Sequence, residues 1–515
     1  MRLYTKGLFM VLILWFGGCH PPQADQEGKT VVPNVILIYA DDLGYGDVGA
    51  YGATGIRTPH MDKLAAGGVR FTNGHAASAT CSPSRYALLT GTYPWRNEKA
   101  RILSGTAPLL IGTDQATLPK MFRRQGYYTG IVGKWHLGLG SGQVNWNGLI
   151  APGPNEVGFD YSFIMAATQD RVPAVYIENG RVVRADPDDP IEVSYQYNFP
   201  GEPTGRDHPE LLKMKYHHGH DNTIVNGISR IGFMKGGTEA RWVDENMADT
   251  FLVKARQFIL QHKEEPFFLY YALQQPHVPR TPHPRFVGST TMGPRGDVIV
   301  EADWCIGQLL LTLEEEGLLE NTLIILTSDN GPVLNDGYYD DADIKVGDHT
   351  PAGPLRGGKY SLFEAGTRVP FITYWKGHID PTVSDALVSQ LDLFASLATL
   401  TGSETKGPDS EDLLRTFLGQ EKTGRGELVT EATGRTAFRK GDWVLIPPYD
   451  GPAIAPYVNI ELGNDPDYQL YHLDGDLGQQ HNLAGIQPEK LREMISAYKV
   501  VRGIADTVSG ELELQ

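Results

Sequence analysis

Two apolar, β-branched runs, each ending at polar side chains, constrain the fold of this chain most strongly. Residues 35–39 (VILIY) lead into Asp41 and Asp42, and residues 322–327 (TLIILT) lead into the tetrapeptide 328–331 (SDNG). Near-continuous apolar strands are typical of parallel sheets covered by helices on both faces. Polar groups that follow such strands lie at the edge where α/β proteins bind ligands. A role in turns is the alternative, because Asp, Asn and Gly also favour turns.

Further strand and helix patterns alternate along the chain. Amphipathic stretches typical of helices lie at residues 61–66, 118–125, 248–262 and 298–316. Strand-like runs lie among them at residues 128–132, 267–271 and 369–373. This alternation predicts an α/β fold, with a mainly parallel mixed sheet sandwiched by helices.

The composition changes after about residue 402, where Pro, Gly and charged residues become frequent. Short strand-like pieces follow at 441–446 and 469–473, and a helical pattern follows at 488–501. We therefore expect one large domain over residues 33–402 and a smaller carboxy-terminal α+β subdomain over residues 403–515.

Charge and cysteine content exclude two classes of protein. The formal charge of −17 over 515 residues argues against a nucleic-acid partner. A protein that binds the phosphates of a nucleic acid usually has an excess of Lys and Arg. An anionic substrate stays possible, because a cationic pocket can lie within an acidic surface. Three widely separated cysteines do not form a disulfide framework.

The amino terminus has the features of an export signal. Arg2 and Lys6 precede the apolar run 8–16, which is too short to span a bilayer, and Gly17-Gly18-Cys19 follows. We expect a signal peptide over residues 1–18, lipidation of Cys19 and a polar tether over residues 19–32. The lipid would anchor the exported protein in the periplasm or on the outer membrane. Because Phe16 stands where Leu is usual in a lipobox, plain cleavage and secretion is the alternative.

The segment 81–91 (CSPSRYALLTG) combines a cysteine with a probable helix start. Cys81, Pro83 and Arg85 have the spacing C-x-P-x-R, and the pattern predicts a helix over 84–90. Residue 81 would then lie near the positive end of the helix dipole, where an anion is stabilised. The simpler alternative is a buried cysteine that opens an ordinary helix.

The polar residues after the two buried strands are suitable cation ligands. Asp41, Asp42, Asp329 and Asn330 offer hard oxygen atoms without a thiolate or imidazole among them. Such a set favours Ca²⁺ or Mg²⁺ and argues against zinc.

Taken in order, these motifs resemble those of the type I, formylglycine-dependent sulfatases of the alkaline-phosphatase-like superfamily. Within this family the chain resembles bacterial carbohydrate sulfatases, arylsulfatases and N-acetylgalactosamine-6-sulfatases. The resemblance extends over about residues 33–490. The matching segments are 41–44 (DDLG), 81–91, 133–138 (GKWHLG), 276–279 (PHVP), 328–331 (SDNG), 355–370 (LRGGKYSLFEAGTRVP), 470–474 (LYHLD) and 481–484 (HNLA).

The resemblance implies a modified nucleophile and one metal ion. A maturation enzyme that reads Pro83 and Arg85 would oxidise Cys81 to formylglycine, whose hydrate Arg85 would hold. Ca²⁺, in preference to Mg²⁺, would be bound by the hydrate at position 81 together with the four oxygen ligands named above. The fold it implies is the alkaline-phosphatase-like α/β fold.

The resemblance also assigns roles in sulfate ester hydrolysis. Lys134 and Lys359 would hold the sulfate, His277 would donate a hydrogen bond or proton to the leaving oxygen, and His136 would act as general base. Attack by the hydrate would give a covalent sulfoenzyme, and cleavage of its C–O bond would then expel sulfate.

The expected substrate is a sulfated carbohydrate, with 6-O-sulfated galactose or N-acetylgalactosamine preferred. Residues 158–245 match no requirement of sulfate transfer and are expected to cover the pocket, with His220 and Asp221 contacting the sugar. The histidine-rich stretch 217–222 could instead be a metal site or a polar surface loop. Two other functions stay open, a phosphomonoester or phosphonate hydrolase of the same superfamily and a carbohydrate-binding protein on an inactive sulfatase fold. Membrane contact is expected only through the lipid anchor.

Overall fold

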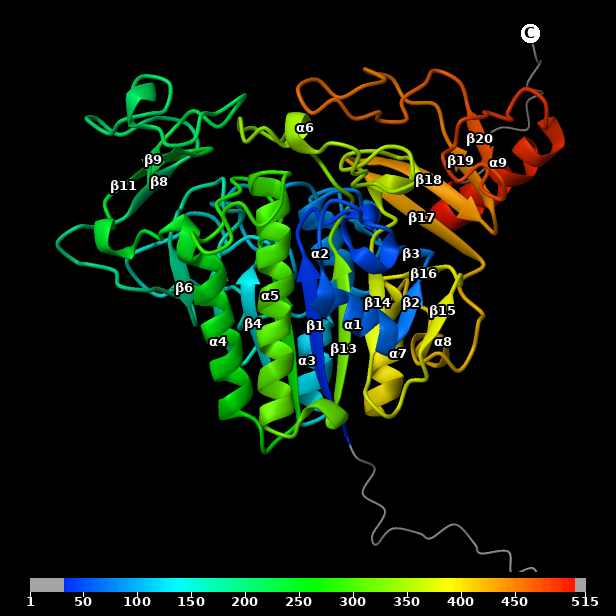
Figure 1. Ribbon diagram of the computed structural model, residues 1–515, viewed down its shortest axis with the longest axis horizontal. Helices are drawn as coiled ribbons and strands as arrows, with labels where there is room; N and C mark the ends of the chain where they lie inside the picture. The colour runs from blue at the N-terminus through cyan, green and yellow to red at the C-terminus, as the bar shows by residue number, and fades with distance from the viewer. Residues whose placement is uncertain (1–31, 505–515) are drawn as a thin grey trace, which may run out of the picture. The chain divides into compact units, whose positions relative to one another are not determined.

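A ten-stranded mixed sheet forms the centre of the structure, a computed structural model that describes residues 32–504 (Figure 1). The predicted signal peptide and the lipidation of Cys19 lie outside the described residues. Residues 33–504 belong to one compact unit. Within residues 32–504, no helix is both long and apolar enough to cross a membrane.

Five neighbouring parallel strands form the middle of the sheet. Strand β1 (Asn34–Ala40) lies between β13 (Thr322–Ser328) and β12 (Phe267–Ala272), with every residue of all three buried. Next to β12 come β4 (Tyr128–Lys134) and β5 (Tyr161–Met165), also parallel. The continuous apolar runs of β1 and β13 are explained by this position, since helices cover both faces of the sheet there. The predicted parallel core is confirmed.

Outer strands complete the sheet with mixed directions. Beyond β13 lie β14 (Phe371–Tyr374) and β2 (Val69–Phe71), each antiparallel to its inner neighbour, and then β15 (Thr382–Ser384). The other edge is formed by β6 (Tyr176–Glu178) and β7 (Arg181–Val182). Because β5, β6 and β7 come from the segment 158–245, the expectation that this segment only covers the pocket was wrong for its first part.

Two adjacent side chains of β12 show that helices cover both faces of the sheet. Phe267 packs edge-on against Phe258 of α4 (Met247–Gln261), and Phe268 stacks on Phe122 of α3 (Leu118–Arg124) at 4.3 Å. Adjacent residues of a strand point to opposite faces, so α3 and α4 lie on different sides. Helices α1 (Pro59–Gly67) and α5 (Pro294–Glu315) accompany α4, while α2 (Cys81–Thr90) and α7 (Asp392–Thr401) accompany α3.

A separate antiparallel sheet follows the large one in sequence. Its strands are β17 (Glu427–Ala432), β18 (Arg435–Lys440), β19 (Trp443–Ile446) and β20 (Gln469–His472), and α9 (Pro488–Arg502) packs against β18 and β19. Leu428 and Phe438 share a buried apolar cluster with Ala87 of α2. The small sheet thus has a common core with the large domain, and the boundary near residue 402 stays a prediction.

Buried charges also join the two sheets. The carboxylate of Glu364 accepts from Arg439 of β18 and from Arg368, each at 3.0 Å, and lies 3.8 Å from the ring of His75. Burial alone would raise the pKa of Glu364, but Arg439, His75 and Arg368 together lower it to about 2. An ionised Glu364 therefore holds the edge of the small sheet against the large one.

We predict that Glu364→Gln destabilises the protein by about 3–5 kcal/mol at pH 7, because it leaves two buried guanidinium groups without their anion. The folded pKa lies below the ordinary Glu value, so this stabilisation is present above about pH 4.5 and is lost as the pH falls toward 2. Urea unfolding of wild type and variant between pH 7 and pH 3 measures the difference. Glu239→Gln, which removes an exposed partner of Arg184, should cost less than about 1 kcal/mol. Equal losses in the two variants would contradict the prediction.

Candidate active site

The carboxyl ends of β1, β4 and β13 meet at one edge of the sheet and bring four charged groups together. Asp41 and Asp42 follow β1, Lys134 ends β4, and Asp329 follows β13. The Lys134 ammonium lies 2.7 Å from Asp41 Oδ1 and 3.6 Å from Asp329 Oδ2, and the Asp42 amide donates to Asp329 Oδ1. All four side chains are buried. The sequence prediction that Asp41, Asp42 and Asp329 lie at the carboxyl ends of neighbouring parallel strands is confirmed.

Cys81 is the first residue of α2, three residues before the predicted start of that helix. Its sulfur lies 3.8 Å from Asp41 Oδ1. Every residue of α2 is buried, and burial raises the pKa of the Cys81 thiol, so the unmodified side chain is a protonated thiol. The helix end and the strand ends therefore surround residue 81.

Arg85 connects α2 to the strand ends. Its Nε and one terminal nitrogen donate to Asp329 Oδ2 at 3.1 and 2.8 Å, and the other terminal nitrogen donates to the Lys134 carbonyl and to Tyr270. This bidentate pair, with Lys134 nearby, holds the pKa of Asp329 well below its ordinary value despite burial. Arg85 thus fixes the carboxylate of Asp329 and the end of β4.

The ligand atoms of Asp41, Asp42, Cys81 and His277 all lie within 4.8 Å of one another, so this buried cluster could hold a metal ion. In the described part of the chain, Asp41 Oδ2 and Asn330 Oδ1 are buried without a hydrogen-bond partner. Burial raises the pKa of Asp41 well above its ordinary value; Lys134 opposes this shift, while Asp329 and Asp42 add to it. A bound cation would satisfy both oxygens and offset the crowded negative charge, so the donor set fits a hard cation.

Lys359 brings a second ammonium group to the cluster. Its Nζ donates to Asp42 Oδ2 at 2.9 Å and to Asp336 Oδ2 at 2.7 Å, and the Tyr360 hydroxyl also contacts Asp336. The sequence predicted Lys359 but missed Asp336 and Tyr360. Asp336 lies in an irregular segment after β13, where no periodic pattern marks it.

His136 is neutral and presents a free acceptor. Its Nε2 donates to the Leu103 carbonyl at 2.9 Å, so Nδ1 carries the lone pair, and Nδ1 is buried without a partner among the described residues. Burial, helped by Lys134 and Arg171, lowers its pKa well below the ordinary value. An unprotonated ring nitrogen in this position can accept a proton.

His277 is neutral in the opposite arrangement. Its Nδ1 donates to the Val278 carbonyl at 2.7 Å, and Nε2 lies 3.9 Å from Asp42 Oδ2. Burial and the neighbouring Lys359 lower its pKa to about 4. Since Nδ1–H is already used, Nε2 can donate only when the ring carries a second proton.

Above this cluster lies a pocket of about 160 Å³. Residues of the α/β core and of the segment 158–245 line it: Cys81, Ile102, His136, Asp170, Arg171, His220, Ile231, His277, Asp336, Lys359 and Tyr360. Asp170, Arg171, Ile102 and Ile231 were not predicted as site residues, because their loops meet only in the folded chain.

His220 and Asp221 have different positions although they are neighbours. His220 lines the pocket and is 2.9 Å from Asp170 Oδ2, and a Cβ placed on Gly337 would lie only 2.0 Å from its ring. Gly337, at φ +115°, therefore makes the room that His220 occupies. Asp221 instead pairs with the exposed Arg206 and is not among the lining residues.

Comparisons with known proteins agree with this site. The sulfatase family model matches residues 33–403. An N-acetylgalactosamine-6-O-sulfatase of Bacteroides thetaiotaomicron is 50% identical over 491 residues, which cover 94% of this chain and 96% of the relative. The Homo sapiens N-acetylgalactosamine-6-sulfatase is 32% identical over 405 residues, 76% of this chain and 67% of that one.

A solved structure from work on the metabolism of multiple glycosaminoglycans by Bacteroides thetaiotaomicron is also similar. It is 50% identical, has a TM-score of 0.91, and covers 92% of this chain and 100% of its own. The family match spans most of the chain, and residues of the motifs 81–91, 133–138, 276–279 and 355–370 line one pocket beside Asp41, Asp42 and Asp329. The chain therefore belongs to the sulfatase family, as a type I sulfatase of the alkaline-phosphatase-like superfamily, and is a sulfuric ester hydrolase.

Proposed function

We propose that this chain hydrolyses the sulfate ester of a sulfated carbohydrate, and that 6-O-sulfated N-acetylgalactosamine is its substrate unit. The observation that carries this proposal is the pocket itself, which Cys81 and Lys359 line together with the polar groups of Asp170, Arg171 and His220. The names of the relatives at 50% and 32% identity support the choice of sugar and position. Phosphate or phosphonate ester hydrolysis has less support, since these relatives are sulfatases.

Residue 81 acts, in this proposal, after a maturation enzyme has oxidised it to formylglycine. The C-x-P-x-R spacing supports this, as does the raised pKa of the buried thiol, because a protonated thiol is a poor nucleophile. The aldehyde hydrate supplies one hydroxyl for attack on sulfur and a second that allows sulfate release by C–O cleavage.

Ca²⁺ is the proposed metal. Asp41, Asp42, Asp329 and Asn330 would hold it together with residue 81, and the unpartnered oxygens of Asp41 and Asn330 support this set. A hard cation supplies positive charge that neutralises sulfate oxygens and favours the ionised nucleophile.

The chain's own residues bind the sulfate and move the protons. Lys134 and Lys359 hold sulfate oxygens as donors fixed by their carboxylate partners. His277 donates from Nε2 to the leaving oxygen; the negative charge of a bound sulfate ester favours the imidazolium that this requires. His136 receives a proton at Nδ1 during turnover, while its Nε2–H stays bonded to the Leu103 carbonyl.

Sugar recognition belongs to the pocket rim in this proposal. His220, Asp170 and Arg171 line the pocket together. They place an imidazole ring, a carboxylate and a guanidinium group where sugar hydroxyls would bind. Asp221 is proposed to act only through the loop that it anchors to Arg206. Export and a lipid anchor at Cys19, in the periplasm or on the outer membrane, are proposed from the sequence of residues 1–32 alone.

We predict that Cys81→Ala abolishes sulfate release from both an aryl sulfate and a sugar sulfate, because the nucleophile is lost. Mass measurement of the wild-type peptide that contains residue 81 should show the aldehyde instead of the thiol. Cys305→Ala changes a buried cysteine of α5 away from the site and should keep full activity. Turnover in the Cys81→Ala variant would disprove the mechanism.

Asp329→Ala should lose bound calcium and activity together, because a hard cation loses a charged ligand. Elemental analysis of purified protein, paired with an aryl sulfatase assay, measures both. Asp244→Ala is the control for the loss of a buried ion pair, because Asp244 pairs with Arg230 as Asp329 pairs with Arg85. The Asp244→Ala protein should keep its bound metal. Asn330→Ala, which leaves Arg85 paired, should weaken metal binding as well. Stoichiometric zinc in active enzyme would contradict the calcium assignment.

His220→Ala should lower kcat/KM for N-acetylgalactosamine 6-sulfate by roughly tenfold to a hundredfold. Both ring nitrogens of His220 are bonded, to the His218 carbonyl and to Asp170. The variant therefore leaves Asp170 without the partner that orients its carboxylate toward the sugar. Activity on a small aryl sulfate should change little. His208→Ala, in the same segment but exposed beside Glu210, is the matched control and should behave as wild type on both substrates. Equal losses of the His220→Ala variant on both substrates would show that His220 serves the chemistry.

A further inference from the structure

Four aromatic rings form a connected group that we call the aromatic ledge, made of His217, His218, Tyr339 and Tyr457. The Tyr457 ring stacks on His218 at 4.8 Å, and His217 contacts Tyr339 edge-on at 4.7 Å and Tyr457 at 6.0 Å. Tyr339 and Tyr457 remain 57% and 66% exposed. Large aromatic side chains that gather on a surface mark a binding site more often than single ones do.

The ledge adjoins the catalytic pocket through the backbone. The His217 amide donates to the Gly337 carbonyl, and the Tyr339 amide donates to the Lys215 carbonyl, so residues 215–217 and 337–339 pair side by side. Asp336 and His220, which flank this pairing, both line the pocket. The His218 ring also contacts the His220 ring edge-on at 5.9 Å. The rings therefore lead from the pocket out to the exposed tyrosines.

Tyr457 is displayed by a strained hairpin from the small sheet. The connection between β19 and β20 forms a hairpin that two backbone hydrogen bonds close. The Ala455 amide donates to the Ile460 carbonyl and the Leu462 amide donates to the Ala453 carbonyl, both at 2.7 Å. Tyr457 at φ +69° and Asn459 at φ +54° both adopt the left-handed conformation. A bulky residue such as Tyr is strained in this conformation, and an exposed Gly would avoid the strain. The strained position therefore points to a use for the ring.

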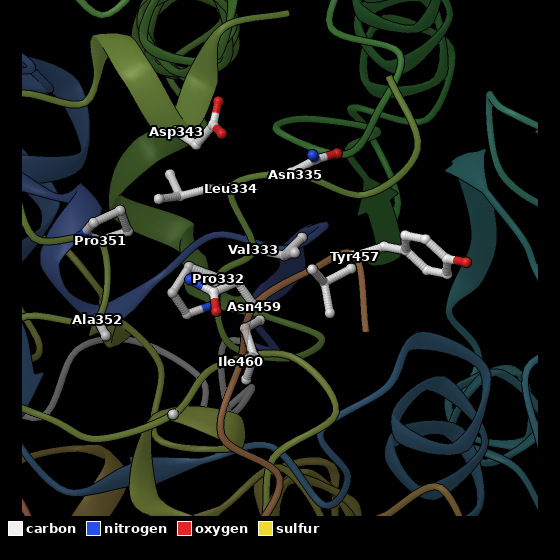
Figure 2. A pocket seen from close by; sticks show the side chains of 12 residues that line it. Pro332, Val333, Leu334, Asn335, Asp343, Pro351, Ala352, Tyr457, Asn459 and Ile460 are labelled. Atoms are coloured by element: carbon white, nitrogen blue, oxygen red, sulfur yellow. The ribbon is translucent and has the colours of Figure 1, made fainter. Parts of the chain in front are cut away.

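The hairpin tip lies over a second pocket, of about 260 Å³, whose apolar walls include Pro332, Val333 and Ile460. Figure 2 shows the Tyr457 ring directed away from the other labelled side chains of this pocket. Tyr457 thus lines the edge of this pocket, while its ring points away from the apolar walls. Its stacking partner is His218, on the side of the catalytic pocket.

We propose that the aromatic ledge binds the pyranose ring that is linked to the sulfated sugar, with Tyr457 stacking on its C–H face. This rests on the proposed function, because a neighbouring ring exists only if the substrate is an oligosaccharide. A pyranose presents an apolar face edged by hydroxyl groups, and tyrosine offers a rigid apolar face with a polar tip. A sugar one glycosidic bond beyond the pocket would lie next to the rim where His218 meets His220. A surface for a protein partner is the competing role.

The test compares three substrates in wild type, Tyr457→Ala and Tyr457→Phe: an aryl sulfate, N-acetylgalactosamine 6-sulfate, and a trisaccharide with that residue at its non-reducing end. Tyr457→Ala should lower kcat/KM for the trisaccharide by about threefold to tenfold and leave the two smaller substrates unchanged. Tyr457→Phe keeps the ring and should retain most of the activity. Tyr197→Ala, which removes a tyrosine of similar exposure (62%) outside the ledge, is the matched control and should behave as wild type.

Each other outcome overturns the proposal. Equal activity of wild type and Tyr457→Ala on the trisaccharide would mean that the ledge binds no sugar. Equal losses on all three substrates would place Tyr457 in the chemistry, and an altered oligomeric state with unchanged kinetics would make the ledge a protein contact. If wild type releases sulfate from the aryl sulfate but from neither sugar substrate, the proposed carbohydrate substrate is wrong, and the ledge proposal falls with it. If wild type acts on both sugar substrates and Tyr457→Ala is unimpaired on the trisaccharide, only the ledge proposal is wrong.

Discussion

The network formed by Arg85, Asp329, Lys134 and Asp41 is the interaction on which the rest of the site depends. It joins α2 to the ends of three strands, and all four side chains are fully buried. Removing one partner from such a network typically costs 3–5 kcal/mol, whereas an apolar replacement of the whole set is often neutral. Stability alone therefore does not explain its presence. Its effect is to hold opposite charges in fixed positions around residue 81, so that little reorganisation is needed when an anion binds.

Much of the fold could be predicted from local pattern. The runs before Asp41 and Ser328 are buried strands because both faces of the sheet are covered, and the polar residues after them meet because parallel strands end at the same edge. Strands β17 and β18 were missed because polar and charged residues surround short apolar pairs, Leu428-Val429 in β17 and Ala437-Phe438 in β18. The two-residue turn Thr433-Gly434, where both residues have positive φ, is the signal that could have indicated this hairpin.

The charged cluster around residue 81 was largely predictable, whereas the pocket wall formed by distant loops was predicted only at His220. Lys134, His136, His277 and Lys359 lie in motifs that a sequence can display, and the structure brings them to one cluster. Asp170, Asp336 and Tyr360 come from irregular segments whose proximity depends on tertiary contacts such as the fit of His220 against Gly337. The chemistry is thus encoded locally, while recognition depends on how distant loops pack.

The burial of α2 would set an order of events for the proposed maturation of Cys81. Cys81 is 2% exposed, and all ten residues of its helix are buried. A modifying enzyme would have to reach a side chain that the folded chain encloses. The proposal therefore implies that modification comes before α2 is packed. A chain that folded first would keep its thiol and, under the same proposal, would be inactive until it unfolded.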